Sequence, residues 1–533
     1  MDKRVEKAQG LLKDYRRGKA TLDARVVEND QWYRLRHWQN MRPSSNPGDP
    51  EPTSAWLLNC LLNKHADAMD NYPEPIVLPR EEGDGEDANV LSAVLPVILE
   101  QNEFEKTYSD MWWQKLKSGA GIMGVFWNPE KLHGLGDVEI RNVDILHLFW
   151  EPGVHDIQKS KNVFYVELQD NEELEKTYPQ LEGKLGTGAD KPQEYEQDDA
   201  LDTSDKSAVV DWYYKKGGTV HFIKYVNDEL LYASEDDEAY RERGFYDHGK
   251  YPFVFDELFS CEGSPVGFGY LDVCKQPQMY IDRLNQVIMK NAVMAARPRW
   301  FVRADGMINE EEYADWEKDF VHYNGSGNPE EHIRPIHTTP VSEIHMALLN
   351  SKIEELKETS GNRDFSQGGT TAGVTAASAI AALQEAGSKL SRDMIRASYR
   401  AFTQVCYLVI ELVRQFYEEP RSFRIVGTKG AQQFVLYSNA RLREQAGVEE
   451  YGVRMGTRCP VFDIKIRPQK ANAFSRTAQN ELAKEFYSLH FFDPANAVQA
   501  LSCLEMMDFE GKDIVAKKIA EQAERMEYGR NQH

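Results

Sequence analysis

The chain has 533 residues, of which 41% are hydrophobic and 28% are charged, and its formal net charge is −23 at pH 7. This length suggests about two to four domains with a substantial core. The mean hydropathy of −0.60, without an uninterrupted apolar run of about 20 residues, argues against a membrane helix. The acidic balance argues against a protein that grips duplex DNA tightly, because phosphate contacts need a basic face, but not against one past which DNA slides.

The N-terminal residues and the cysteines carry no pattern of a secretion signal, a CxxC pair or a zinc site. The N-terminal residues Met1 to Lys7 are charged, so they lack the apolar core of a secretion signal. The cysteines show neither CxxC pairs nor a Cys/His cluster with zinc spacing. They are Cys60, Cys261, Cys274, Cys406, Cys459 and Cys503. We therefore expect free thiols in a reducing compartment, with no metal site and no cofactor.

Residues 1 to about 130 are predicted to be mainly helical. Helical patterns cover residues 55–71, 88–102 and 103–118. The aromatic residues around Leu35 are typical of a helix that packs its aromatic side inward. They are Trp32, Tyr33 and Trp38. The acidic, glycine-containing segment Glu81 to Asp87 predicts an exposed loop.

From residue 122 to 259 the pattern favours strands, because β-branched and aromatic residues alternate with turn signals. The predicted strands span residues 138–141, 145–150, 163–168, 208–214 and 219–226. Lys215 to Gly218 predicts a hairpin turn between the last two strands. The acidic stretch Glu194 to Asp205 has low hydrophobicity and predicts a surface loop.

The second half returns to helical periodicity. Helices are predicted at 278–296, 308–321 and 341–359, with a strand at 300–303. A long helix from Thr375 to Glu418 would measure roughly 65 Å at about 1.5 Å per residue. Strands at 423–426, 434–437 and 461–466 and a helical tail from Ala471 to Tyr528 complete the chain.

The segment Gly368 to Thr371, just before the long helix, superficially resembles a phosphate-binding loop. Such loops cradle anionic oxygens on backbone N–H groups, but the P-loop pattern also needs a Lys-Ser/Thr ending. Here no lysine follows until Lys389. The sequence therefore favours a flexible loop before a helix capped by Thr375, and argues against nucleotide binding.

Other motifs also weigh against catalysis. No HExxH or GxSxG pattern is present, and we expect no catalytic residue. Arg392, Arg396 and Arg400 are spaced four apart and therefore share one helix face. Two interpretations of these arginines stay open: contact with DNA or a neighbouring subunit, or pairing with acidic helices of the same chain.

Two segments carry a family resemblance. Residues 360–387 read SGNRDFSQGGTTAGVTAASAIAALQEAG, and Phe492-Asp493-Pro494 runs on to Leu504-Glu505-Met506-Met507-Asp508. Both resemble portal proteins of tailed bacteriophages and prophages of Gram-positive hosts, and Asp144 to Pro152 is more weakly similar. The resemblance implies an α+β, mainly helical, portal-like fold with wing, stem, clip and crown zones.

The resemblance also implies zone boundaries. The wing would comprise residues 1–270, with helices and an antiparallel sheet, and residues 375–470, with the long helix and further strands. The two stem helices would be 271–296 and 341–360, with the clip at 297–340 between them. A tunnel loop would span 361–374, and a helical crown 471–533.

The implied function is a channel at one capsid vertex through which viral DNA is packaged and ejected. The implied partners are eleven further copies in a dodecameric ring, double-stranded DNA, the terminase large subunit, major capsid and scaffolding proteins, and a head-completion adaptor. The protein would reside in the virion, after assembly in the host cytoplasm, and would bind no membrane. The alternatives are another head or tail structural protein, or a nucleotide-dependent enzyme of DNA metabolism.

The resemblance assigns three sets of site residues. The tunnel loop would use Asn362, Arg363, Asp364, Phe365, Ser366, Gln367, Gly368, Gly369, Thr370 and Thr371. The channel-facing stem residues would be Glu343, Glu354, Glu355, Glu358, Lys352 and Lys357. The clip interface would use Arg299, Trp300, Arg303, Glu310 and Trp316.

Overall fold

The computed structural model divides into two compact units, Met1–Ala68 with Pro75–Ile466, and Met69–Glu74 with Arg467–His533. The residues that the structure describes are 2–41, 49–186, 191–196, 203, 205–296, 299–302, 311–312, 322, 333–336, 342–361, 389–426, 432–443, 445–446, 449–450, 453–454, 457–470, 483–493, 496–505 and 515–520. Helices and strands are mixed throughout, so the predicted α+β class is confirmed. The assignment of wing, stem, clip and crown zones stays a prediction.

The larger unit contains a five-stranded antiparallel sheet. Its order is β4-β5-β6-β7-β8. The strands are β4 (Leu148–Trp150), β5 (Asn162–Asp170), β6 (Lys206–Lys216), β7 (Thr219–Val226) and β8 (Glu229–Ala233). Gly217 and Gly218, with φ of 61° and 92°, form the tight turn between β6 and β7. The predicted hairpin is thereby confirmed.

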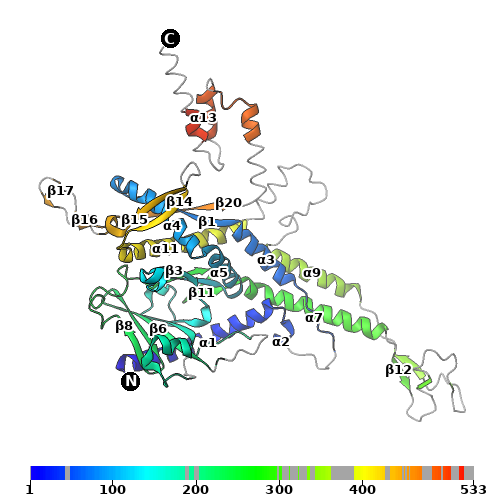
Figure 1. The fold of residues 1–533 in the computed structure, drawn as a ribbon. Helices are drawn as coiled ribbons and strands as arrows, with labels where there is room; N and C mark the ends of the chain where they lie inside the picture. Colours follow the sequence, from blue (N-terminus) through cyan, green and yellow to red (C-terminus); the bar gives the residue numbers. More distant parts are fainter. Residues whose placement is uncertain are drawn as a thin grey trace. The chain divides into compact units, whose positions relative to one another are not determined.

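The long N-terminal helix α1 (Lys3–Tyr33) packs on one face of this sheet (Figure 1). Val5, Ala8, Leu12 and Tyr15 recur at helical spacing, and all four are buried against apolar side chains of the strands. The other face is covered by Leu174 of α6 (Asn171–Thr177) and by the 3-10 helix η5 (Pro179–Leu181). The strands therefore alternate their side chains between two apolar layers.

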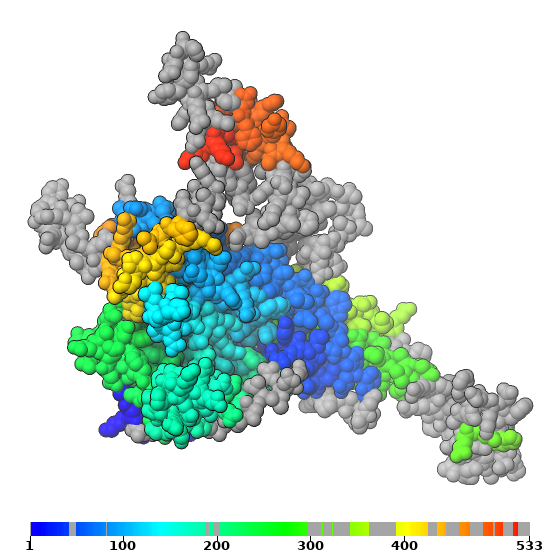
Figure 2. Space-filling view, in the orientation of Figure 1, coloured from blue at the N-terminus to red at the C-terminus, as the bar shows by residue number. Residues whose placement is uncertain are grey.

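A second sheet, of order β3-β2-β9, lies beside the central helices. It comprises β2 (Ala120–Asn128), β3 (Asp137–Asn142) and β9 (Phe253–Glu257). α5 (Phe104–Ser118) packs on β2 and β3, and α11 (Lys389–Phe416) packs on β9 and β2. β14 (Arg421–Val426) and β15 (Gln432–Tyr437) form a separate two-stranded sheet, with β14 against α4 (Gly85–Gln101). In the space-filling view, yellow residues of this part of the chain lie against blue ones from the N-terminal part (Figure 2).

The remaining elements are shorter or lie at the edges. The helices are α2 (His37–Asn40), α3 (Trp56–Met69), α7 (Tyr270–Ala296) and α9 (Glu343–Ser360). Short 3-10 helices are η1 (Glu82–Asp84), η2 (Lys131–Gly134), η3 (Ile145–His147), η4 (Ile157–Lys159) and η8 (Asn439–Arg441). Two-stranded pairs join β1 (Asn71–Pro79) with β20 (Phe462–Lys470), β10 (Phe259–Cys261) with β11 (Ser264–Phe268), β12 (Arg299–Val302) with β13 (Ile333–Ile336), β16 (Gln445–Ala446) with β19 (Thr457–Arg458), and β17 (Glu449–Glu450) with β18 (Val453–Arg454).

The smaller unit confirms part of the predicted helical tail. Helical residues occur at 483–488, in α13 (Ala497–Glu505) and at 515–520. Phe486, Ala497, Ala500, Leu504 and Ile519 form its buried apolar cluster. The other predicted positions of the tail lie outside the described residues.

The structure differs from the expected elements in three places. The segment Ile145 to Trp150 is not one strand, because Asp144 accepts a hydrogen bond from the Leu146 backbone N (2.8 Å) and caps the 3-10 turn η3 before β4. β1 was not expected, since three prolines stand within its nine residues. Proline is tolerated in a strand only at edges or bulges, and β1 lies in a sheet of two strands.

The third correction concerns the acidic segment Glu81 to Asp87, which is not simply an exposed loop. Asp84 and Asp87 are buried. Arg458 forms ion pairs with Glu81 and with Asp84, the latter at 2.9 Å. Arg441 binds Glu86 and Asp87, at 3.2 and 3.3 Å. The acids thus hold the start of α4 against the segment that precedes β20.

A buried ion pair ties together the central elements. Lys115 on α5 lies 2.7 Å from Asp256 on β9, and the two side chains are 0% and 2% exposed. Ser398 on α11 accepts a hydrogen bond from Lys115 Nζ (2.7 Å) and donates one to Asp256. Burial lowers the pKa of Lys115, and the Asp256 carboxylate opposes that shift. α5, β9 and α11 are therefore joined at one point by an ion pair and hydrogen bonds as well as by apolar packing.

A pH prediction follows from His248, which stacks on Tyr246 and accepts a hydrogen bond from the Lys250 backbone N (3.0 Å). Burial lowers the pKa of His248 to about 4, whereas an unfolded histidine titrates near 6.5. Stability from the neutral ring is therefore complete above about pH 6.5 and is lost as the pH falls towards 4. In urea unfolding at fixed protein concentration, we expect His248→Asn to remove on the order of 2 kcal/mol of that pH-dependent loss. A His248→Asn variant with the native pH profile would contradict the prediction.

Candidate functional site

The candidate site is the helical hairpin formed by α7 and α9, which run side by side (Figure 1). Ile281 of α7 and Leu349 and Leu356 of α9 are buried together with Cys60 of α3. Leu284, Ile288 and Ile353 pack around this cluster. Gly361, with φ of 67°, ends α9. Both predicted helices are confirmed, although their role as a stem is not tested by this packing.

A buried polar network fixes the first half of α7. The Asp282 carboxylate lies 2.6 Å from His37 Nδ1 and accepts hydrogen bonds from the Ser54 backbone N (3.0 Å) and hydroxyl (2.8 Å). Gln278, one turn earlier, donates to Asp282 (3.0 Å) and accepts from the Leu57 backbone N (3.0 Å). This network was not predicted from the sequence. Its signal is a pair of polar residues four apart on an otherwise apolar helix face.

The charged residues predicted to face a channel lie on the exposed part of α9. Glu343, Glu354, Glu355 and Glu358 are exposed. Lys352 pairs with Glu355 (2.6 Å) and Lys357 with Glu354 (3.4 Å). Four glutamates against two lysines leave this set of residues with a net charge of −2. The helix face is therefore acidic, but two of its carboxylates are partly neutralised by neighbours on the same helix.

Apolar side chains are also exposed on the same hairpin. They are 44% to 71% accessible, and they comprise Tyr280, Val287, Met289 and Val293 on α7 and Ile344, Met346 and Leu348 on α9. A soluble chain rarely leaves so many large apolar groups on one element unless another surface covers them. The hairpin therefore has the character of an interface between protein chains.

Between α7 and α9, β12 and β13 form an antiparallel pair. Arg299 lies opposite Ile336 and Trp300 opposite Pro335, which confirms a strand close to the predicted position. The other clip residues predicted from the resemblance, Arg303, Glu310 and Trp316, lie outside the described residues. The same holds for all ten tunnel-loop positions, 362–371, and for the predicted start of the long helix, 375–388.

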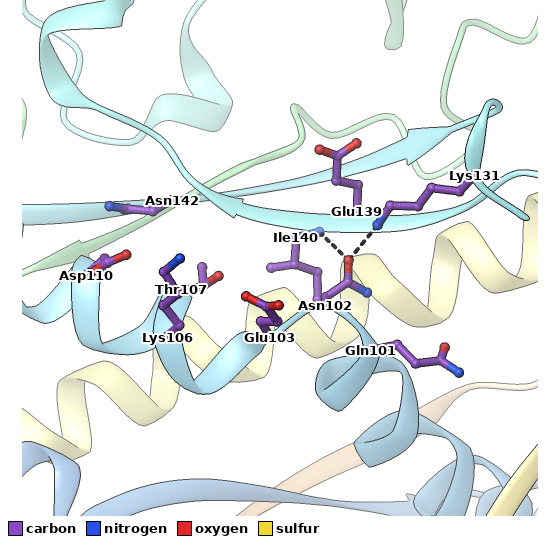
Figure 3. Close-up of a pocket in the computed structure, with 10 residues that line it drawn as sticks. All are labelled: Gln101, Asn102, Glu103, Lys106, Thr107, Asp110, Lys131, Glu139, Ile140 and Asn142. Atoms are coloured by element: carbon purple, nitrogen blue, oxygen red, sulfur yellow. Dashed lines mark hydrogen bonds between the residues drawn. The ribbon is translucent and has the colours of Figure 1, made fainter.

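A pocket of about 350 Å³ opens between the start of α5, β3 and η2 (Figure 3). The Asn102 side chain is held in place in this pocket. Its oxygen accepts hydrogen bonds from Lys131 Nζ (2.9 Å) and from the Ile140 backbone N (3.2 Å). Glu103, Lys106, Asp110, Glu139 and other polar residues complete the lining. The lining residues include no histidine, cysteine or serine.

The described residues contain no group of three or more His, Cys, Asp and Glu that could hold a metal ion. Within the same residues, no helix is long and apolar enough to span a bilayer. All six cysteines are free thiols, as expected.

Comparison with known proteins adds one finding. A family model described as Phage P22-like portal protein matches residues 66–254 and 263–532, which is most of the chain. The match includes α7, α9, α11 and the segments in which the sequence resemblance was found. A comparison with curated proteins gives no match.

Proposed function

The chain belongs to the P22-like portal protein family, and we propose that it forms the ring-shaped channel at a unique capsid vertex through which viral DNA is packaged and ejected. Family membership implies a homo-oligomeric ring associated with the capsid. We propose twelve subunits, assembly in the host cytoplasm, and a Gram-positive host. In this proposal the chain catalyses nothing, and the packaging ATPase is a separate terminase subunit.

The observation that best supports the ring is the exposed apolar surface of the α7–α9 hairpin. Exposed groups occur on both helices, including Val287 and Val293 on α7 and Ile344 and Leu348 on α9. A ring needs a heterologous interface, in which one face of each subunit meets a different face of the next. A two-helix hairpin with apolar groups on both helices can supply both faces.

The direct test is to image the purified full-length chain by electron microscopy and to measure its mass by native mass spectrometry. We expect closed rings with an axial opening. A stable monomer at micromolar concentration, or an open filament, would overturn the proposal. ATP turnover by the purified protein would favour the alternative of a nucleotide-dependent enzyme. Closed rings found at the tail of the virion would favour another structural protein.

The acidic face of α9 gives a prediction about DNA movement. We propose that Glu354, Glu355 and Glu358 face the channel and lower adhesion of DNA by like charge. Replacing all three by lysine should slow packaging in vitro by several-fold at low salt, and the defect should shrink as salt rises, because screening weakens the added attraction. The triple glutamine variant is the matched control, with an intermediate effect expected. Packaging at the native rate by the lysine variant would contradict the prediction.

The proposed tunnel loop, residues 362–371, can be tested separately from ring formation. Deleting Gly368 to Thr371 should leave the subunit number unchanged and reduce DNA packaging or retention. Loss of rings in this variant would show instead that the segment belongs to the subunit core. We further propose that Arg299, Trp300, Arg303, Glu310 and Trp316 contact the terminase and later the head-completion adaptor, and that residues 471–533 form the crown among the capsid and scaffolding proteins.

A further inference from the structure

One face of α11 carries exposed arginines at regular spacing. Arg392, Arg396 and Arg400 are all exposed and stand four residues apart. Each interval advances about 6 Å along a helix, so the three positions span about 12 Å on one side. We call these three residues the arginine stripe.

Arg396 and Arg400 form no hydrogen bond or ion pair with the described residues. Arg400 lies near enough to the buried Lys115 for its charge to lower the pKa of that ammonium. Asp393 is exposed on the same helix but forms an ion pair with neither of them. Exposed arginines elsewhere do lie near carboxylates, as Arg17 (3.2 Å from Asp14) and Arg80 (2.8 Å from Asp463) show. Arg392 has an interaction of its own, so the argument rests on the other two.

The stripe is held rigidly and is not apolar. Ser398, which lies between Arg396 and Arg400, is buried and bonded to Lys115 and Asp256, so the helix is fixed at this turn. The described part of α11 exposes no large apolar side chain, in contrast to α7 and α9. Arginine is common at protein interfaces too, but there it accompanies an apolar buried centre, whereas a polyanion needs only fixed cations at suitable spacing.

We propose that Arg396 and Arg400, with Arg392 as a third position, contact backbone phosphates of the duplex DNA that the ring holds. This inference rests on the proposed function, because it requires DNA inside a ring of these subunits. Contacts to a few phosphates per subunit, in a chain whose net charge is −23, favour weak and non-specific binding that permits sliding.

The experiment compares intact rings of the native chain, of R396Q/R400Q, and of the control R17Q/R243Q. Both double variants remove two exposed positive charges per subunit, and both control arginines lie close to a carboxylate. Each ring is mixed with a fluorescent duplex of about 30 base pairs, which is several helical turns long. Binding is followed by fluorescence anisotropy from low to moderate salt. Native mass spectrometry gives the subunit number of each ring.

We expect R396Q/R400Q to weaken binding at low salt by about 10-fold or more. The variant should also make the slope of log affinity against log salt shallower by about 2 for each arginine stripe that contacts the duplex, because each lost phosphate contact lowers that slope by about 0.9. The control should keep the native affinity and slope. Native rings that bind no duplex, or an R396Q/R400Q ring that binds like the control, would overturn the inference and leave the ring proposal standing. A changed subunit number with native affinity per ring would overturn it too, and would assign the stripe to the neighbouring subunit. Absence of rings in the native chain would instead overturn the proposed function.

Discussion

Replacing Asp256 by alanine should lower the free energy of unfolding by about 3 to 5 kcal/mol, because it leaves the ammonium of Lys115 buried without its counter-charge. The Lys115 side chain is 0% exposed, and its second partner, Ser398, is uncharged. Trp112, whose ring centroid lies 4.5 Å from Lys115 Nζ, offers only a weaker cation–π contact. Urea and thermal unfolding at one fixed protein concentration would measure the loss, since assembly adds to apparent stability.

A double variant separates the charge effect from packing. Lys115→Met with Asp256→Leu removes both charges and keeps apolar volume, so it should recover most of the stability lost in Asp256→Ala. Changing Asp14→Ala, which belongs to an exposed pair with Arg17, should have no measurable effect. If Asp256→Ala were as stable as the native chain, or if the double variant were the least stable of all, the buried pair would not be the element that joins α5, β9 and α11.

Replacing both Ile344 and Leu348 by aspartate should prevent ring formation while leaving the subunit folded. Both side chains are exposed on α9, so the isolated subunit loses little packing. In a ring that buries them, each contributes about 1.5 to 3 kcal/mol per interface. Their loss, with two carboxylates added, should weaken each contact by at least about 100-fold.

Subunit mass by native mass spectrometry and helix content by circular dichroism would together check this second prediction. The matched control is Asn350→Asp with Ser351→Asp, which adds the same charge at exposed polar positions of the same helix. Rings should persist in the control. Intact rings in the Ile344 and Leu348 variant would place the subunit interface elsewhere, and an unfolded monomer would show that the two residues belong to the core.

Elements governed by local periodicity could be predicted from the sequence. α9 was identifiable because Leu349, Ile353 and Leu356 recur at helical spacing and turn towards α7. The β6–β7 hairpin was identifiable because two glycines stand between two alternating strands. In these cases the residues that decide the structure lie within one or two turns of each other.

Features decided by distant residues could not be predicted. β1 exists because β20, almost 400 residues later in the chain, pairs with it despite the prolines. The acids near Glu81 looked solvent-exposed because Arg458, 377 residues away, cannot be connected with them from one sequence. For the candidate site, the charged residues of α9 were named from the family resemblance. The exposed apolar groups were not predicted, since periodicity does not tell which apolar residues another chain will cover.

The network around Asp282 has a mechanical consequence. One carboxylate joins α7 to His37 on α2 and to Ser54 ahead of α3, so turning α7 about its own axis would break all of these bonds at once. Bending farther along the helix leaves them intact, and beyond Lys290, which binds Asp49 (2.9 Å), α7 continues for six more residues. We infer that α7 resists rotation about its axis at Asp282 more than it resists bending beyond Lys290. We infer that a load applied at the tip reaches the base as flexure rather than as rotation.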